Sequence, residues 1–166
     1  IVADGQTLTE ASANSFGNPI LGGADAGPLV IWEERNLAET TSRRSRIVWR
    51  ARDDRTWTWG TTNNASAMHA TAYITSRATA PGGLIAFSWL GCDDNSRSRC
   101  TSYLTKVVGG VWSTQSLGNR GPTMLYSTQV AINPRGEAIA IWSFDLVEGC
   151  TQLQTEKCAR IHGLRF

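Results

Sequence analysis

The stretch Gly83-Leu84-Ile85-Ala86-Phe87-Ser88-Trp89 decides the fold, because related stretches occur at residues 26–32 and 136–142. Each begins with a small residue, continues as an apolar run of about five residues and closes on a tryptophan. The runs are short, rich in β-branched or aromatic side chains and bounded by Gly or Pro, so they predict strands rather than helices. Because they are apolar on both faces, each is predicted to be an inner strand covered on two sides.

A second strand-like segment follows each run, at residues 45–52, 101–107 and 159–166. The first of these places Ile47, Trp49 and Ala51 on one face, and on the other it places Arg46, Arg50 and Arg52. In the first two repeats the chain continues into a turn and a further aromatic strand, at residues 53–59 and 109–113. The pattern therefore predicts three repeats, at approximately 17–66, 67–119 and 120–166.

The cysteines follow the same repeat. Cys92 and Cys100 are separated by seven residues, as are Cys150 and Cys158, and each pair lies between an inner strand and its successor. Four cysteines allow three connectivities, of which the repeat favours 92–100 and 150–158. Zinc is the competing interpretation, but paired zinc thiolates usually lie two to four residues apart. Two disulfides predict an exported protein, which is secreted, periplasmic or on the cell surface.

The composition limits the classes of protein to which this chain can belong. The chain has 166 residues, 41% hydrophobic and 18% charged, with a formal net charge of +2. It is too apolar for a disordered tail, and its apolar runs are too short for a membrane span. The small net charge gives no reason to expect a nucleic-acid partner. No segment shows clear helical periodicity; Thr7–Ala13 is the best helical candidate, and polar loops are expected around 37–44, 61–67 and 116–123. The sequence predicts a single all-β domain.

These repeats resemble the blades of β-propellers of the sialidase-like and bacterial lectin-like type, which carry an inner strand ending in Trp and later a turn ending in Trp. In the turn motif of that family, Ser-x-Asp-x-Gly-x-x-Trp, the positions before Trp112 match at Thr105, a hydroxyl in place of Ser, and at Gly109, whereas Val107 stands at the Asp position. The resemblance implies antiparallel blades, about two and a half in this chain. Since propellers close with four to eight blades, further blades are expected from a longer chain or from homo-oligomerisation. An open sandwich that only looks repetitive is the third alternative.

The candidate ligand-binding residues lie in or beside the turns that follow the inner strands. Exposed indoles there stack on sugar rings, and arginine forks bind carboxylates or sulfates. The candidates are Trp57, Trp59, Trp112, Arg50 and Arg52. The alternative is that the tryptophans pack between blades and the arginines form a solvated face. Trp32, Trp89 and Trp142 are predicted core residues.

No catalytic, metal or cofactor set stands out. His69 and His162 have no potential ligand at a suitable spacing, and no motif singles out two of the carboxylates, which a glycosidase needs. The sequence therefore favours a non-catalytic, exported binding or surface-assembly module, with a glycan or a protein surface as its ligand. The alternative is a fragment of a sialidase-like glycoside hydrolase whose catalytic residues lie mostly outside this chain.

Overall fold

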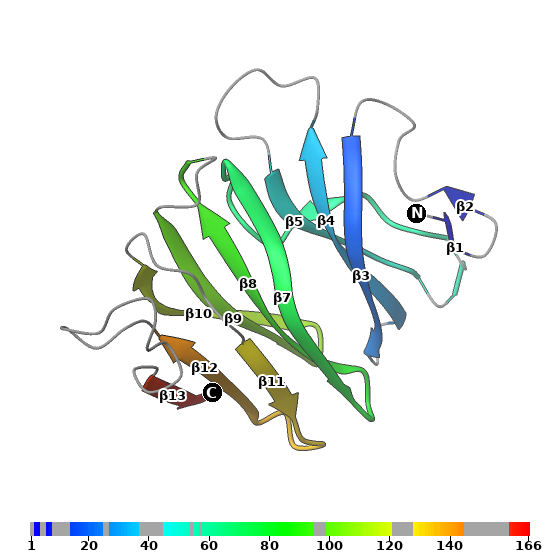
Figure 1. Ribbon diagram of the computed structural model, residues 1–166. Helices are drawn as coiled ribbons and strands as arrows, with labels where there is room; N and C mark the ends of the chain where they lie inside the picture. The colour runs from blue at the N-terminus through cyan, green and yellow to red at the C-terminus, as the bar shows by residue number, and fades with distance from the viewer. Residues whose placement is uncertain are drawn as a thin grey trace.

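The computed structural model contains strands and turns only, in the residues that it describes (Figure 1). The described residues are 2–3, 6–7, 14–24, 27–36, 45–53, 55–56, 58–94, 99–120, 128–144 and 160–166. Every strand pairing among them is antiparallel. The prediction of an all-β, antiparallel protein is confirmed. Within these residues there is no helix that could cross a membrane.

Three sheets follow one another along the chain, each a meander in which neighbouring strands are consecutive. The first sheet contains β3 (Asn14–Ala24), β4 (Gly27–Asn36), β5 (Ser45–Ala51) and β6 (Asn63–Asn64). The second contains β7 (Thr71–Ala80), β8 (Leu84–Cys92), β9 (Cys100–Val108) and β10 (Val111–Arg120). The third contains β11 (Thr128–Ile132), β12 (Ala138–Phe144) and β13 (Arg160–Arg165). A separate two-stranded pair joins β1 (Val2–Ala3) to β2 (Gln6–Thr7).

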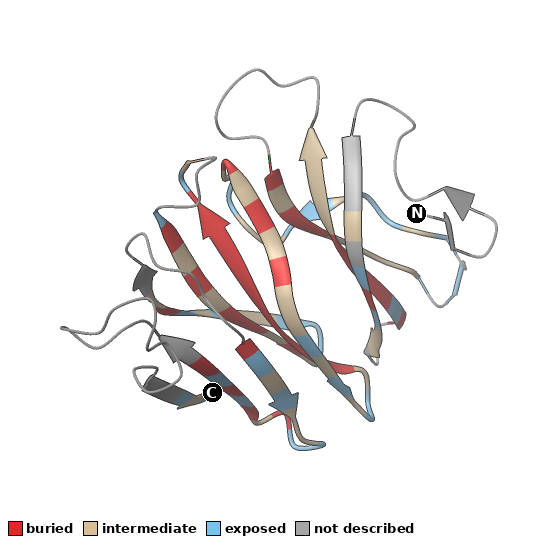
Figure 2. Cartoon of the chain, in the orientation of Figure 1, coloured by how far each residue is buried: buried red, intermediate tan, exposed pale blue. Residues whose placement is uncertain are grey.

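The three apolar runs form the second strand of each sheet, namely β4, β8 and β12. Each pairs with a strand on both sides, and every residue of β8 is buried (Figure 2). The prediction that these runs are inner strands is therefore confirmed. The prediction that both faces are covered is wrong for β12, where Ile139 and Ile141 are exposed because no sheet lies beside them among the described residues. The strand-like segments that follow them form β5, β9 and β13, again as expected.

Two predicted boundaries are wrong. A turn and then an aromatic strand were expected at residues 53–59. The turn is present, since Asp53 accepts hydrogen bonds from the backbone N–H groups of Arg55 and Thr56, at 2.8 and 2.9 Å, but the described residues after it form no strand. Only an isolated bridge, between Arg52 and Trp59, follows the turn. The loop expected at 116–123 is partly strand, because β10 continues to Arg120. Of the helical candidate, Thr7 lies in β2 and the other residues lie outside the described ones.

The sheets stack face to face, with the second sheet between the first and the third (Figure 1). Between the first and second sheets the core includes Ile31, Ile47 and Phe87. Between the second and third it is built around Leu104 and Trp142. Alternation along a strand explains this arrangement, because successive side chains of an inner strand enter the two opposite interfaces.

Close stacking also requires a glycine in the first sheet. A Cβ atom on Gly22 would lie 2.2 Å from Cδ1 of Ile85, which is fully buried in the second sheet. A larger residue at position 22 would therefore require the buried Ile85 side chain or one of the two sheets to shift.

A disulfide joins Cys92 to Cys100, with an S–S distance of 2.08 Å, at the end of the β8–β9 hairpin. The first predicted pairing is thus confirmed, and the described part of the chain contains no free cysteine. Cys150 and Cys158 lie outside the described residues. Both bonded cysteines are buried beside Leu90, so the bridge is also part of the packing.

Replacing both Cys92 and Cys100 by alanine is expected to lower the free energy of unfolding by about 2.5 kcal/mol, because the short loop is no longer closed in the unfolded chain. Urea denaturation, followed by tryptophan fluorescence, measures this loss. A double variant as stable as the wild type would show that the disulfide does not contribute to the free energy of unfolding.

Candidate functional site

Trp112, a predicted ligand-binding residue, lies in the interface between the first two sheets. Its ring stacks on Trp49 of β5, with centroids 5.1 Å apart and planes at 26°. It also meets Phe87 edge-on, with ring centroids 6.4 Å apart. The indole is half-buried, Phe87 is a core residue, and Trp49 is partly buried against the same core. This placement matches the alternative considered for the turn tryptophans, namely packing between sheets.

Trp59 lies on the opposite face of the first sheet. It packs against the buried side chains of Val30, Trp32 and Val48, and its Nε1 atom is buried. The structure therefore separates Trp59 from Trp112 by the thickness of a sheet. Trp57 lies outside the described residues.

The two candidate arginines belong to β5 and its continuation. Nε of Arg50 donates a hydrogen bond to Oγ1 of Thr62 at 2.7 Å, and the backbone N–H of Arg52 donates to the carbonyl of Pro28 at 2.8 Å. Arg50 points away from the second sheet, since its neighbour Trp49 faces that sheet. The candidate residues therefore do not form one site around Trp112.

The carboxylates of the first sheet have structural partners. Glu34 pairs with Arg46, whose Nε and Nη2 atoms both lie 2.6 Å from the same carboxylate oxygen. Glu33 accepts a hydrogen bond from the backbone N–H of Ile74 at 2.6 Å, which ties the first sheet to the second where β7 has a bulge. The hydrogen bonds from the backbone of Thr56 and then Arg55 hold the pKa of Asp53 below its usual value. A glycosidase acid needs a raised pKa, and Asp53 has the opposite shift.

His69 belongs to an aromatic cluster at one end of the interface between the first two sheets. Its ring meets Trp89 edge-on at 5.7 Å, and Trp89 stacks on Tyr103 at 4.1 Å. A Cβ atom on Gly91 would lie 2.7 Å from the imidazole, so a larger residue there would require the His69 ring to move. No group of three metal-ligating side chains occurs among the described residues. The side chain of His162 lies outside them.

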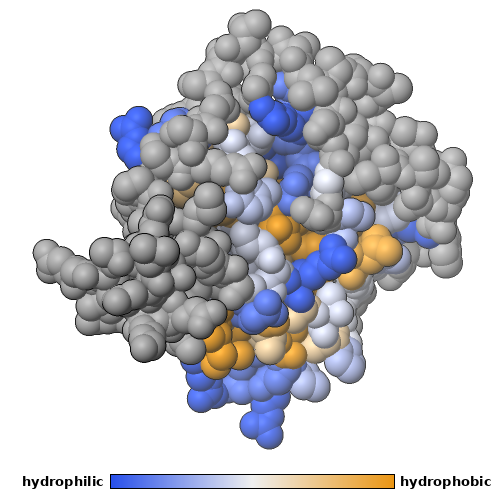
Figure 3. Space-filling view, in the orientation of Figure 1, coloured by the Kyte–Doolittle hydropathy of each residue, from blue (hydrophilic) through white to orange (hydrophobic). Residues whose placement is uncertain are grey.

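The outer face of the third sheet, which points away from the second sheet, is apolar and exposed. On β12, Ala138, Ala140 and Trp142 are buried toward the second sheet, whereas Ile139 and Ile141 are 44% and 46% exposed on the other side. We call this outer surface the third-sheet face. By register it comprises Gln129, Ala131, Ile139, Ile141, Gly163 and Arg165. In Figure 3, hydrophobic residues reach the surface in the lower part of the view, next to the hydrophilic β11–β12 hairpin.

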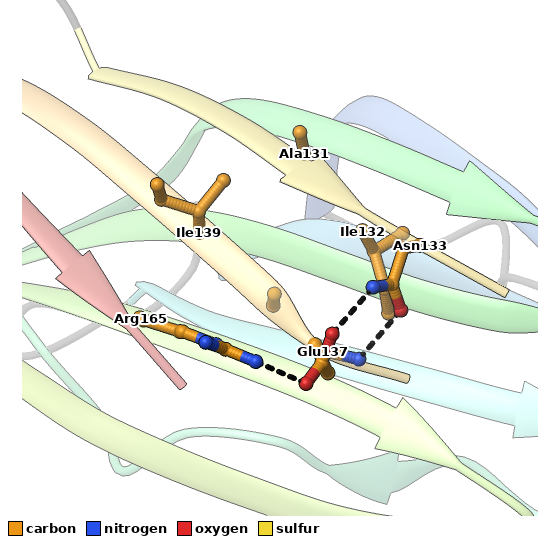
Figure 4. Close-up of a pocket in the computed structure, with 7 residues that line it drawn as sticks. Ala131, Ile132, Asn133, Glu137, Ile139 and Arg165 are labelled. Carbon is orange, nitrogen blue, oxygen red and sulfur yellow. Dashed lines mark hydrogen bonds and ion pairs between the residues drawn. The ribbon is translucent and has the colours of Figure 1, made fainter. Parts of the chain in front are cut away.

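The third-sheet face has a ridge and hollows. The two isoleucines of β12 form the ridge, and the small residues opposite them are Ala131 on β11 and Gly163 on β13. On the β11 side a hollow of about 290 Å³ is lined mainly by apolar atoms, with Glu137 and Arg165 at its rim (Figure 4). The face therefore resembles half of a sheet-to-sheet interface rather than a polar binding cleft.

The β11–β12 hairpin holds Glu137, one of the two charged residues at the rim of this hollow, in place. Oδ1 of Asn133 accepts hydrogen bonds from the backbone N–H groups of Arg135 and Glu137, at 2.9 and 3.0 Å. Nδ2 of Asn133 donates to the Glu137 carboxylate at 2.7 Å, and Nη2 of Arg165 donates to its other oxygen. The hydrogen bond from Asn133, followed by the interactions with Arg165, holds the pKa of Glu137 below its ordinary value.

The hairpin is therefore expected to lose stability in acid. Because the pKa of Glu137 is lowered by folding, its contribution is complete above the ordinary Glu pKa and is lost as pH falls through the lower, folded value. Thermal melts from neutral pH down to about pH 3 should fall less steeply for Glu137→Gln than for the wild type. Parallel curves for the two proteins would contradict this role.

Comparisons with known proteins identify no family. No protein-family model matches the chain, and no curated protein matches it significantly. Among solved structures, the sucrose-6-phosphate hydrolase from Lactobacillus gasseri is similar, with 16% sequence identity and a TM-score of 0.47. The match covers 96% of this chain and 37% of that protein, so the chain spans less than half of the hydrolase.

Proposed function

We propose that this chain is an exported, non-catalytic module of β-propeller-like blades, and that a further sheet, from a longer chain or from another molecule, packs on the third-sheet face. The partner surface is a further blade-like sheet. We infer such a partner because the second sheet packs on the first and the third packs on the second.

The proposal is supported by a comparison of equivalent positions in the three inner strands. Counting back from the closing tryptophan, Ile141 corresponds to Ile31 in the first sheet and to Ser88 in the second, and both of these are buried. Ile139 corresponds in the same way to Leu29 and Ala86, which are also buried. Only in the third sheet are the two positions almost half exposed.

Exposure of both isoleucines is costly in water. Removing apolar surface from water contributes about 25 cal/mol per Å², and contiguous apolar patches often mark interaction surfaces. A sheet packed at the usual spacing of about 10 Å would bury both side chains, as the second sheet buries Ile31.

Other features favour assembly over catalysis or glycan binding. Glu33, Glu34 and Glu137 each hold a structural hydrogen bond or ion pair. One face of the Trp112 indole is covered by its stacking on Trp49 and the ring lies half-buried between two sheets, which favours a packing role over sugar binding. The disulfide between Cys92 and Cys100 is typical of exported proteins.

Footprinting of the protein in an extract of its natural source tests the proposal. Carbene labelling is expected to leave Ile139 and Ile141 protected and to modify Val111, which is 66% exposed on the β9–β10 hairpin and serves as the internal control. If the two isoleucines react as readily as Val111, the third-sheet face is uncovered in its native setting and the proposal fails.

A further inference from the structure

We propose that Arg35 binds an oxyanion, a carboxylate or a sulfate group, at one end of the interface between the first and second sheets. This site lies apart from the third-sheet face, so it goes beyond the proposed function and does not depend on it. Its central group is a half-buried guanidinium near the end of β4.

Arg35 is a cation whose charge is not neutralised by a neighbouring side chain. Its Nε atom is buried and forms no hydrogen bond. Among the described residues, no carboxylate forms an ion pair with it. A buried N–H that forms no hydrogen bond costs free energy, and hydrogen bonds between charged partners are the strongest. An acceptor that carries negative charge would therefore stabilise this side chain.

The two carboxylates of β4 are held by other groups. Glu34 points to the opposite face of the strand, where it forms its ion pair with Arg46. Glu33 lies on the same face as Arg35. One oxygen of Glu33 accepts the hydrogen bond from the backbone N–H of Ile74, and the other lies 3.0 Å from the position of a Cβ atom on Gly17. This carboxylate is therefore held between β3 and β7.

The strand register places Arg35 in a row of polar residues that faces the second sheet. Arg35 lies directly opposite Ser45 on β5, and Ser45 pairs with His69 through two backbone hydrogen bonds of 2.8 Å. Directly opposite residues of antiparallel strands point to the same face. His69 faces the second sheet, where its ring contacts Trp89. Arg35, Ser45 and His69 therefore line the same end of the interface.

The second sheet offers an aromatic surface at this end of the interface. Trp89 stacks on Tyr103, and the imidazole of His69 packs against Gly91. A charged hydrogen bond beside such a surface is stronger than one in water, because the local dielectric constant is low. Arg35 remains partly accessible, and in Figure 3 hydrophilic residues reach the surface at the upper end of β4. A small anion can therefore reach the guanidinium.

The class of ligand follows from the shape of the guanidinium. Its Nε and one terminal nitrogen form a parallel pair of N–H donors, which matches two oxygens of a carboxylate or a sulfate. In Arg35, Nε is the atom that has no acceptor. We therefore expect the anion to bind through two hydrogen bonds at this edge. The free ions should bind weakly, in the millimolar range, because a single arginine supplies the charge.

Titration of the isotope-labelled protein with sodium sulfate, and separately with sodium acetate, tests the site by NMR. Sodium chloride keeps the ionic strength constant. The Nε–H signal of Arg35, assigned from its loss in Arg35→Lys, is expected to shift saturably with at least one anion, and the stronger response tells whether the site prefers a sulfate or a carboxylate. Arg135, exposed on the β11–β12 hairpin, is the matched control, and its signal should not saturate.

Thermal melts measure the same binding without signal assignment. The wild type should melt at a higher temperature in the bound anion than in chloride of equal ionic strength, because a ligand of the folded state stabilises it. Arg35→Gln should lose this difference and Arg135→Gln should keep it. If Arg35→Gln does not fold, Arg35→Lys should bind at least tenfold more weakly than the wild type. An Arg35 signal that responds to neither anion, or no more than that of Arg135, would overturn the inference and leave the proposed function untouched.

Discussion

Replacing Phe87 by alanine is expected to lower the free energy of unfolding by about 4 kcal/mol, the largest effect of any substitution considered for this protein. Phe87 is fully buried on β8 and points into the core between the first and second sheets, where its ring meets Trp112 edge-on. Truncation removes most of a large side chain from the central interface of the stack. The surrounding strands are held by hydrogen bonds on both sides of β8, so the cavity cannot easily close.

Urea denaturation of Phe87→Ala, followed by far-ultraviolet circular dichroism, measures the loss. Val111→Ala is the matched control, because Val111 is exposed and its truncation is expected to change stability by less than about 0.5 kcal/mol. A loss below about 1.5 kcal/mol for Phe87→Ala would mean that the first two sheets do not rely on this interface.

The inner strands could be predicted because a strand that is buried on both faces has an unbroken run of apolar residues in its sequence. An apolar run such as residues 84–87 has no polar face that could meet solvent, so its environment follows from the sequence. The first strand of each sheet gives a weaker signal. β3 contains three glycines, and it has a register shift between Gly17 and Ile20. β7 mixes buried Ala72 and Ile74 with polar neighbours and has a bulge of its own. Such interruptions hide the alternation from which a strand is recognised.

The candidate site was harder to predict, for a different reason. Ile139 and Ile141 occur in a run that resembles those of β4 and β8, so the sequence predicts burial on both sides. Whether they are exposed depends on which sheet lies beside them, and that is a property of the stack rather than of the strand. Only the positions of the sheets in the structure show that Ile141 is exposed whereas the equivalent residue Ile31 is buried.

Replacing Trp112 by alanine is expected to cost about 3 kcal/mol of stability, because the indole is half-buried between Trp49 and Phe87. This outcome distinguishes the two roles considered for the residue. A ligand-binding tryptophan on the surface can be removed with little effect on unfolding, whereas one that joins two sheets cannot.

A double-mutant cycle tests the pairing itself. If Trp49 and Trp112 stabilise the protein through their stacked rings, Trp49→Ala and Trp112→Ala should be less than additive by about 1 kcal/mol. Each single variant should also speed unfolding, since the contact joins strands from different sheets and is expected to form late in folding. Strict additivity would mean that the two rings pack independently, and a stable Trp112→Ala would return this residue to the candidates for ligand binding.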